Sequence, residues 1–277
     1  MRAVYYYFRV AVLPFLLFLN CKNGFSQIIV GDSFLDIYAS AYVKSVDEFM
    51  QRFNAEDFHP DLDTTRNDSF RCRSILTLFD FQQFQVRDSL VAGQLIAFAD
   101  TVCKKDIRLD LEGGGLYAEA CCSFSFNQRE EKINLVFIFE PIRDDIYRWA
   151  LVGANGLLEN GLLDNSRNGY INPTQHGVRF TELSAASTDL TRFLSINKSV
   201  DQLSFLLGML NTGRLSYIAC DKVRFHFVQV PGYVFIVDEV NRQGNNSGYL
   251  INTLLKTDFS QKLEYINHLL GDEHSEK

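Results

Sequence analysis

The chain has 277 residues, of which 47% are hydrophobic and 22% charged, and its formal net charge is −7 at pH 7. This length is enough for one large domain or two modest ones with a hydrophobic core. The acidic balance argues against nucleic-acid binding, because phosphate backbones repel an acidic surface and no basic stretch is interleaved with aromatic residues.

The N-terminus has the layout of a secretory signal peptide. Arg2 and Arg9 precede an apolar run, Val10–Leu19, and a small-x-small site follows at residues 24–26. We therefore predict that residues 1–27 direct export to the periplasm or outside a bacterial envelope, and that the mature net charge is about −10. The apolar run is shorter than a membrane-spanning helix, which needs about 20 residues. Later segments are also too short or too polar, so we expect no transmembrane span.

Cys21 offers an alternative, a lipoprotein whose mature chain begins at a lipidated cysteine. The segment is similar to the bacterial lipobox, but that motif has a small residue just before the cysteine, where this chain has Asn20. A lipid anchor through Cys21 is therefore the alternative to a freely exported chain.

The first half of the mature chain begins with helical patterns. Residues 45–54 start with a capping box, Ser45 and Glu48, and place apolar residues at helical spacing. Residues 33–44 are also compatible with a helix. Residues 71–84 and 88–105 predict two further helices, the second starting at Asp88 or Ser89.

From residue 107 the periodicity becomes that of strands. The candidates are residues 107–111, 116–126, 133–142 and 147–154. Short turn-rich connections join them, which favours an antiparallel meander. Residues 156–180 contain Asn-Gly pairs and a proline, and they predict a connector between two halves.

The second half repeats the plan of helices followed by strands. Residues 187–195 and 199–210 predict helices, and residues 260–270 predict a terminal one. Strand candidates are residues 214–220, 222–230, 232–240 and 247–256. The motif at residues 44–49 also recurs at residues 198–203. The fold class is therefore α+β, with two similar units packing helices on curved antiparallel sheets: a cone-like domain at 28–155 and a second domain at 181–277. The pattern leaves open whether the halves share one sheet.

Residues 45–155 resemble the cone-shaped fold of the nuclear-transport-factor-two-like superfamily, which includes ketosteroid-isomerase-like proteins. The resemblance lies in the element order and in the last strand, "YRWALVGANG", whose Trp149 is similar to a buried tryptophan of that family. It implies helices that enclose a pocket against a curled sheet. The family includes isomerases, dehydratases and non-enzymatic binding or dimerisation modules. Its isomerase-type tyrosine-and-aspartate pattern has no counterpart here, so the resemblance implies no activity.

The stretch "GGGLYAEACC" at residues 113–122 is the first candidate for chemistry. A phosphate-binding glycine loop leads into a helix, whereas residues 113–115 lead into a strand and act as a hairpin turn. Side chains alternate along that strand, so Tyr117, Glu119 and Cys121 share one face and Cys122 belongs to the drier one.

The cysteines do not form a recognisable framework. The exported chain keeps five, so at most two bridges form and one thiol is left over. We expect Cys121 to bridge to Cys72 or Cys103, or to remain a thiol. The spacings do not match a zinc site, and the acidic segment at residues 61–68 lacks the glycine and glutamate of a calcium loop. We therefore expect no metal and no cofactor.

The sequence nominates no catalytic triad among its five histidines and its carboxylate pairs. The residues that we expect to line a ligand pocket are Tyr117, Glu119 and Trp149. The function favoured is an exported, non-catalytic module that binds a protein, a glycan or a small ligand. The alternative is a small-molecule cavity enzyme of the isomerase, dehydratase or hydrolase type. The sequence leaves open whether the chain forms a homodimer.

Overall fold

The computed structural model describes residues 43–56, 68–85, 88–143, 146–162, 201–242 and 246–271. The predicted signal peptide, Cys21 and the helix expected at 187–195 lie outside these residues. Most of the predicted connector also lies outside them, as does the start of the second copy of the short motif.

Five helices are described, and polar side chains begin most of them. The helices are α3 (Val46–Asn54), α4 (Asp68–Thr77), α5 (Ser89–Lys104), α7 (Gln202–Asn211) and α8 (Phe259–Leu270). The hydroxyl of Ser45 accepts from the Glu48 backbone N–H, and Asp88 and Asp201 cap α5 and α7 in the same way. Among these described helices, none is long and apolar enough to cross a bilayer.

Six antiparallel strands form one sheet. They are β1 (Leu116–Phe126), β2 (Arg129–Arg143), β3 (Ile146–Asn155), β4 (Leu215–Phe227), β5 (Tyr233–Val240) and β6 (Gly248–Lys256). Their order is β3-β2-β1-β4-β5-β6, so β1 of the first half pairs with β4 of the second. The α+β class is confirmed, and the strands of both halves belong to one continuous sheet.

Two strand predictions were wrong. Residues 107–111 are not a strand: the side-chain amide of Asn54 accepts from the Leu109 N–H and donates to its carbonyl, both at 2.8 Å. The Arg71 guanidinium also donates to the carbonyl of Ile107. These side chains satisfy the backbone groups that a strand partner would otherwise take. Residues 113–115 are therefore a turn before β1, not a hairpin. The separate strands expected at 214–220 and 222–230 form the single strand β4.

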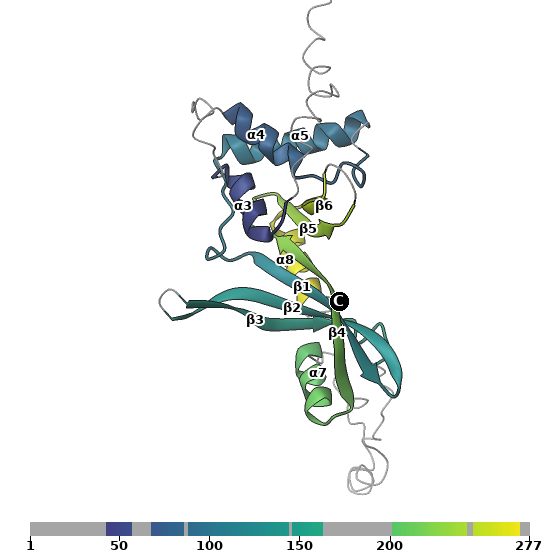
Figure 1. Cartoon of the computed structure of the whole chain (residues 1–277). Helices are drawn as coiled ribbons and strands as arrows, with labels where there is room; N and C mark the ends of the chain where they lie inside the picture. The colour runs from purple at the N-terminus through teal and green to yellow at the C-terminus, as the bar shows by residue number, and fades with distance from the viewer. Residues whose placement is uncertain are drawn as a thin grey trace, which may run out of the picture.

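The two faces of the sheet carry different residues and are packed against different helices. Directly opposite residues of antiparallel strands point to the same face. The core face carries Ala118, Ala120 and Cys122, and the other, which we call the α8 face, carries Tyr117, Glu119 and Cys121. In Figure 1, α3, α4 and α5 lie together at one end of the molecule and α7 lies at the other, while α8 lies behind the strands.

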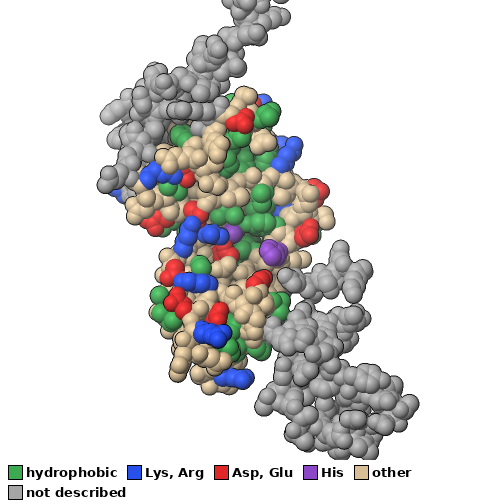
Figure 2. Space-filling view, turned by 90° about the vertical axis from the view of Figure 1, so that its right-hand side faces the viewer, with side chains coloured by type: hydrophobic (Ala, Val, Ile, Leu, Met, Phe, Trp, Pro, Cys, Tyr) green, Lys and Arg blue, Asp and Glu red, His purple; other side chains and the backbone are tan. Residues whose placement is uncertain are grey.

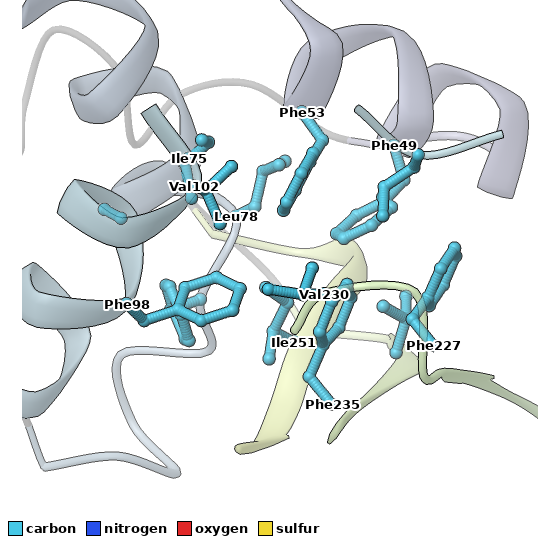
Figure 3. Packing of buried hydrophobic residues seen from close by; sticks show 14 of the residues in the cluster. Phe49, Phe53, Ile75, Leu78, Phe98, Val102, Phe227, Val230, Phe235 and Ile251 are labelled. Carbon is cyan, nitrogen blue, oxygen red and sulfur yellow. The ribbon is translucent and has the colours of Figure 1, made fainter. Parts of the chain in front are cut away.

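Aromatic side chains dominate the core under α3, α4 and α5. Figure 3 shows Phe49 and Phe53 of α3 above Phe227 and Phe235 of the sheet. The rings of Phe227 and Phe235 stack with centroids 4.9 Å apart, and Phe98 of α5 meets Phe235 edge-on at 5.6 Å. A second cluster lies under α7, where Leu206 and Met209 pack with buried residues of β1, β2 and β3. Both clusters use the core face, whereas the buried polar side chains Glu119 and His226 lie on the α8 face together with the buried Val136.

Candidate functional site

Helix α8 is fixed on its face of the sheet at both ends. Near its start, the Lys262 ammonium donates to the carbonyls of Val228 and Val230, each at 2.8 Å. Near its end, the backbone of Leu270 comes so close to Gly153 that a Cβ there would lie 2.7 Å from the Leu270 carbonyl oxygen. Gly271 ends the helix in the left-handed region, with φ 77°. A side chain at residue 153 would therefore clash with α8 in its present position on the sheet.

A buried hydrogen-bonded array joins β1, β4 and α8. The His226 Nε2 lies 3.2 Å from Glu119 Oε2, and its Nδ1 lies 2.5 Å from the Tyr265 hydroxyl. Only 8% of Glu119 and 3% of His226 are exposed. An ionised carboxylate only accepts, so Nε2 carries a proton and donates to Glu119. The neutral ring then accepts from Tyr265 at Nδ1, and the charged ring donates to its oxygen. Both ring nitrogens are occupied in either state.

Two further groups hold the Glu119 carboxylate. The Asn134 amide donates to Oε1 at 2.9 Å, and the Arg224 guanidinium lies 3.7 Å from Oε2. Burial alone would raise the pKa of Glu119, but the hydrogen bond and charge of His226, the charge of Arg224 and the Asn134 amide outweigh it and hold that pKa below its ordinary value. Glu119 is therefore ionised at neutral pH.

The hydroxyl of Tyr265 is kept protonated. Burial against the sheet, followed by the negative charge of Glu119, raises the pKa of Tyr265 far above its ordinary value, although Arg224 opposes this effect. A phenol in such surroundings acts as a hydrogen-bond donor rather than as a phenolate.

A second cluster of charged side chains lies beside Glu119 on the same face of the sheet, on β4 and β5. Arg224 lies opposite both Glu119 of β1 and Asp238 of β5, and its Nε is 3.7 Å from Asp238 Oδ1. The buried Asp238 also accepts from Lys222 at 2.7 Å and from the amide of Asn252. Arg224 is thus flanked by two carboxylates, which offset its charge.

These groups border a pocket between the sheet and the end of α8. Its volume is about 230 Å³, and its lining consists mainly of polar side chains, namely Glu119, Asn134, Asn155, Glu159, Gln202, Arg224, His226, Tyr265 and His268, with Leu269 and Gly271. Figure 2 shows histidine, acidic and basic side chains gathered near the middle of the described surface. Asn155 donates to the Leu269 carbonyl at 2.9 Å, and Gln202 joins the Leu157 N–H to the Gly271 carbonyl. The wall is therefore preorganised by its own hydrogen bonds.

The structure separates the three residues expected to line a pocket. Glu119 lies in the pocket. Tyr117 is two residues away on the same face, half-buried, and burial raises its pKa, but it is not among the lining residues. Trp149 lies opposite Phe139 and meets Phe225, which places it on the core face. It is 39% exposed, so it is not the buried tryptophan that the resemblance implied.

We compared the chain with protein-family models, with curated protein sequences and with solved structures, and found no match. The resemblance to the cone fold therefore stays a prediction.

Sequence reasoning missed His226 and Tyr265 as site residues. The alternation in "VRFHFVQV" does place Arg224 and His226 on one face, but nothing local pairs β4 with β1. Tyr265 follows β1 by more than 100 residues and belongs to α8, where helical spacing puts Leu263, Ile266 and Leu270 on one face. The buried residue of α8 is Leu269, whereas Leu263 is exposed.

Of the two outcomes expected for Cys121, a bridge to Cys72 or Cys103 and a free thiol, the structure shows the thiol. Cys72 of α4 and Cys103 of α5 form a disulfide with each other, because the two helices pack side by side with the cysteine Cα atoms 6.0 Å apart. Among the described cysteines, Cys121, Cys122 and Cys220 are thiols. The described residues contain no group of three His, Cys, Asp or Glu side chains placed to hold a metal ion.

Proposed function

We propose that the chain is an exported, non-catalytic binding module whose pocket beside α8 accepts a small, neutral, polyhydroxylated ligand of about monosaccharide size. The carrying observation is the preorganised polar array around Glu119, His226 and Tyr265. Export is supported by the disulfide between Cys72 and Cys103, since such bridges persist mainly in oxidising compartments.

The size and lining of the pocket support this ligand class. Its volume of about 230 Å³ is below the roughly 300–1,000 Å³ of typical cofactor sites, which are mostly apolar. Carboxylate and amide oxygens accept hydrogen bonds, while amide and guanidinium groups donate them. A polyol both donates and accepts at each hydroxyl, so it matches such a wall better than an apolar ligand does.

The balance of charge favours a neutral ligand. Arg224 is the fully charged cation of the lining, and Glu119 and Asp238 flank it at 3.7 Å. An anionic ligand would also meet Glu159, and a cationic one would meet Arg224. Either charge would lose its hydration without an unopposed partner, which is costly in a partly buried site.

The hydrogen bonds of the array favour binding over catalysis. A general base needs an unoccupied lone pair within reach of the substrate. His226 uses both ring nitrogens within the protein, so it has no lone pair left for a substrate proton. Glu119 keeps lone pairs that can accept a hydrogen bond from a ligand, but its lowered pKa makes it a weak base. These groups therefore suit hydrogen bonding to a ligand better than removal of a proton from it.

The alternative is a small-molecule cavity enzyme, and the short contact between Tyr265 and His226 is the observation that favours it. In such an enzyme Tyr265 would take a proton from the substrate while passing its own to Nδ1 of His226, with Glu119 stabilising the imidazolium. The raised pKa of Tyr265 opposes this role, because it makes the phenolate harder to form.

Thermal unfolding in the presence of candidate ligands tests the proposal. A neutral hexose should raise the unfolding midpoint, and at 100 times its Kd it should stabilise the fold by about 2.7 kcal/mol. The matching uronic acid and amino sugar should have weaker effects. Asn134→Ala should weaken binding about 5- to 10-fold through loss of one or two hydrogen bonds. Asn211→Ala, at the exposed end of α7 on the other face, is the matched control and should bind normally.

Two results would contradict the proposal. A preference for the charged sugars would refute the ligand class. Conversion of a bound sugar to product that is abolished by Tyr265→Phe would instead establish the enzyme.

A further inference from the structure

An irregularity in the pairing of β1 with β4 brings two cysteines opposite each other. From Leu116 to Cys121 the register is regular, and continued further it would place Asp221 opposite Cys122. The register shifts by one residue between Cys121 and Cys122, so that Cys122 lies opposite Cys220 instead. A bulge of this kind re-aims side chains.

The contacts around the bulge show which way its side chains point. Asp221 accepts from Ser123 at 2.8 Å, and Lys222 donates to Asp238 at 2.7 Å. Ser123 and Asp238 both lie on the α8 face, so Asp221 and Lys222 point to that face although they are neighbours. Cys220 is thereby placed on the core face, which is the face of Cys122.

We propose that Cys122 and Cys220 are a redox-active pair that closes a second disulfide across β1 and β4. Directly opposite residues of antiparallel strands have Cα atoms about 4.5–5.5 Å apart, within the range of about 4.4–6.8 Å that disulfides span. Cys121 is excluded as a partner because it points to the α8 face and lies opposite Lys222.

The exposure of the two thiols sets the order of the steps. Cys122 is buried, whereas Cys220 is exposed on the part of β4 that precedes its pairing with β5 at Arg224. Burial, together with the neighbouring Cys220 thiol to which it is hydrogen-bonded, raises the pKa of Cys122 to about 12. Cys220 is therefore the thiol that meets an oxidant, and Cys122 is the resolving one.

The oxidant that we name is a small-molecule disulfide such as oxidised glutathione. The Cys220 thiolate attacks one glutathione sulfur, which forms a mixed disulfide and releases one glutathione thiolate; that thiolate takes up the proton that Cys220 lost. The Cys122 sulfur then attacks Sγ of Cys220, and its proton goes to the departing second glutathione. The two protein thiols are oxidised by two electrons, and one glutathione disulfide is reduced to two thiols.

Peptide mapping of the full chain in glutathione buffers tests the pair. Trypsin releases Cys220 in residues 215–222 and Cys121 with Cys122 in residues 109–129. In oxidised glutathione we expect these two peptides to be joined, and the joined species to disappear after reduction. The urea midpoint of the oxidised wild type should also lie above that of oxidised Cys220→Ser, a comparison in which the Cys72–Cys103 disulfide is present on both sides.

Two variants identify the sulfur atoms. Cys121→Ser should retain the joined peptides, whereas Cys220→Ser should abolish them. Cys121 is half-buried and Cys220 is exposed, so neither variant should prevent folding. Loss of the joined peptides in Cys121→Ser would overturn the proposal. So would a wild-type chain in which Cys220 stops at the mixed disulfide with glutathione while Cys122 remains reduced.

Discussion

Replacement of Glu119 by alanine should destabilise the fold by about 2–4 kcal/mol. The substitution leaves the buried Nε2–H of His226 without its acceptor, and an unsatisfied buried donor costs about 1–3 kcal/mol. The Asn134 amide also loses its acceptor, but it borders the pocket, where water can replace the carboxylate at a cost of about 1 kcal/mol. A fully buried ion pair would cost about 3–5 kcal/mol to break. The Arg224 side chain is 47% exposed, so loss of its ion pair with Glu119 should cost less than that.

Urea unfolding followed by the fluorescence of Trp149, the one tryptophan of the chain, measures this effect. With a slope of about 3 kcal/mol per molar urea, a loss of about 3 kcal/mol lowers the midpoint by about 1 M. Glu119→Gln keeps an acceptor and should lose only about 1–1.5 kcal/mol. Glu264→Gln, on the exposed side of α8, should change stability by less than about 0.5 kcal/mol. If Glu119→Ala is no more destabilising than this control, the array does not hold α8 on the sheet.

Three further predictions concern the pH dependence of the Glu119 array, the packing of two glycines and the disulfide. The folded-state pKa of Glu119 is lowered, so the ionised carboxylate stabilises the fold fully above the unfolded pKa of about 4.3. This stabilisation is lost as the pH falls through the folded-state pKa. In urea titrations below about pH 4.3, the difference in stability between wild type and Glu119→Gln should therefore shrink. Gly153→Ala would push a Cβ against the backbone of α8 and should destabilise the fold by about 1–3 kcal/mol. Gly93→Ala in α5, where no atom lies within 4 Å of the new Cβ, should instead stabilise it by about 0.5–1 kcal/mol. Equal shifts of the thermal unfolding midpoint in the two variants would refute the close approach of Gly153 to α8. Replacing Cys72 and Cys103 by serine opens a bridge with a sequence separation of 31 and should cost about 3.5 kcal/mol in urea unfolding under non-reducing conditions; an unchanged midpoint would contradict the bridge.

Much of the local structure could be predicted from the sequence because it depends on neighbouring residues. Alternation in "LYAEACCSFSF" correctly placed Glu119 and Cys122 on opposite faces of β1. The Asp88 cap and the helical spacing behind it gave α5. The pocket could not be predicted in the same way, since its three central groups come from β1, β4 and α8.

The failures have a common physical cause, namely contacts between distant segments. Residues 107–111 alternate like a strand, but Asn54, more than 50 residues earlier, takes their backbone hydrogen bonds. Trp149 has the right residue type for a pocket, but the register of β3 against β2 turns it to the core face. The bulge that brings Cys220 opposite Cys122 depends on the pairing of β1 with β4 and leaves no local signal.

Saturation-transfer NMR of a neutral hexose mixed with the protein tests the central claim most directly, because one spectrum reports both binding and chemical change. We predict transfer of saturation to the sugar, a clear loss of that transfer in Asn134→Ala but not in Asn211→Ala, and sugar resonances that stay unchanged for hours. The account would be contradicted by an absence of transfer in the wild type, or by new product resonances that vanish in Tyr265→Phe.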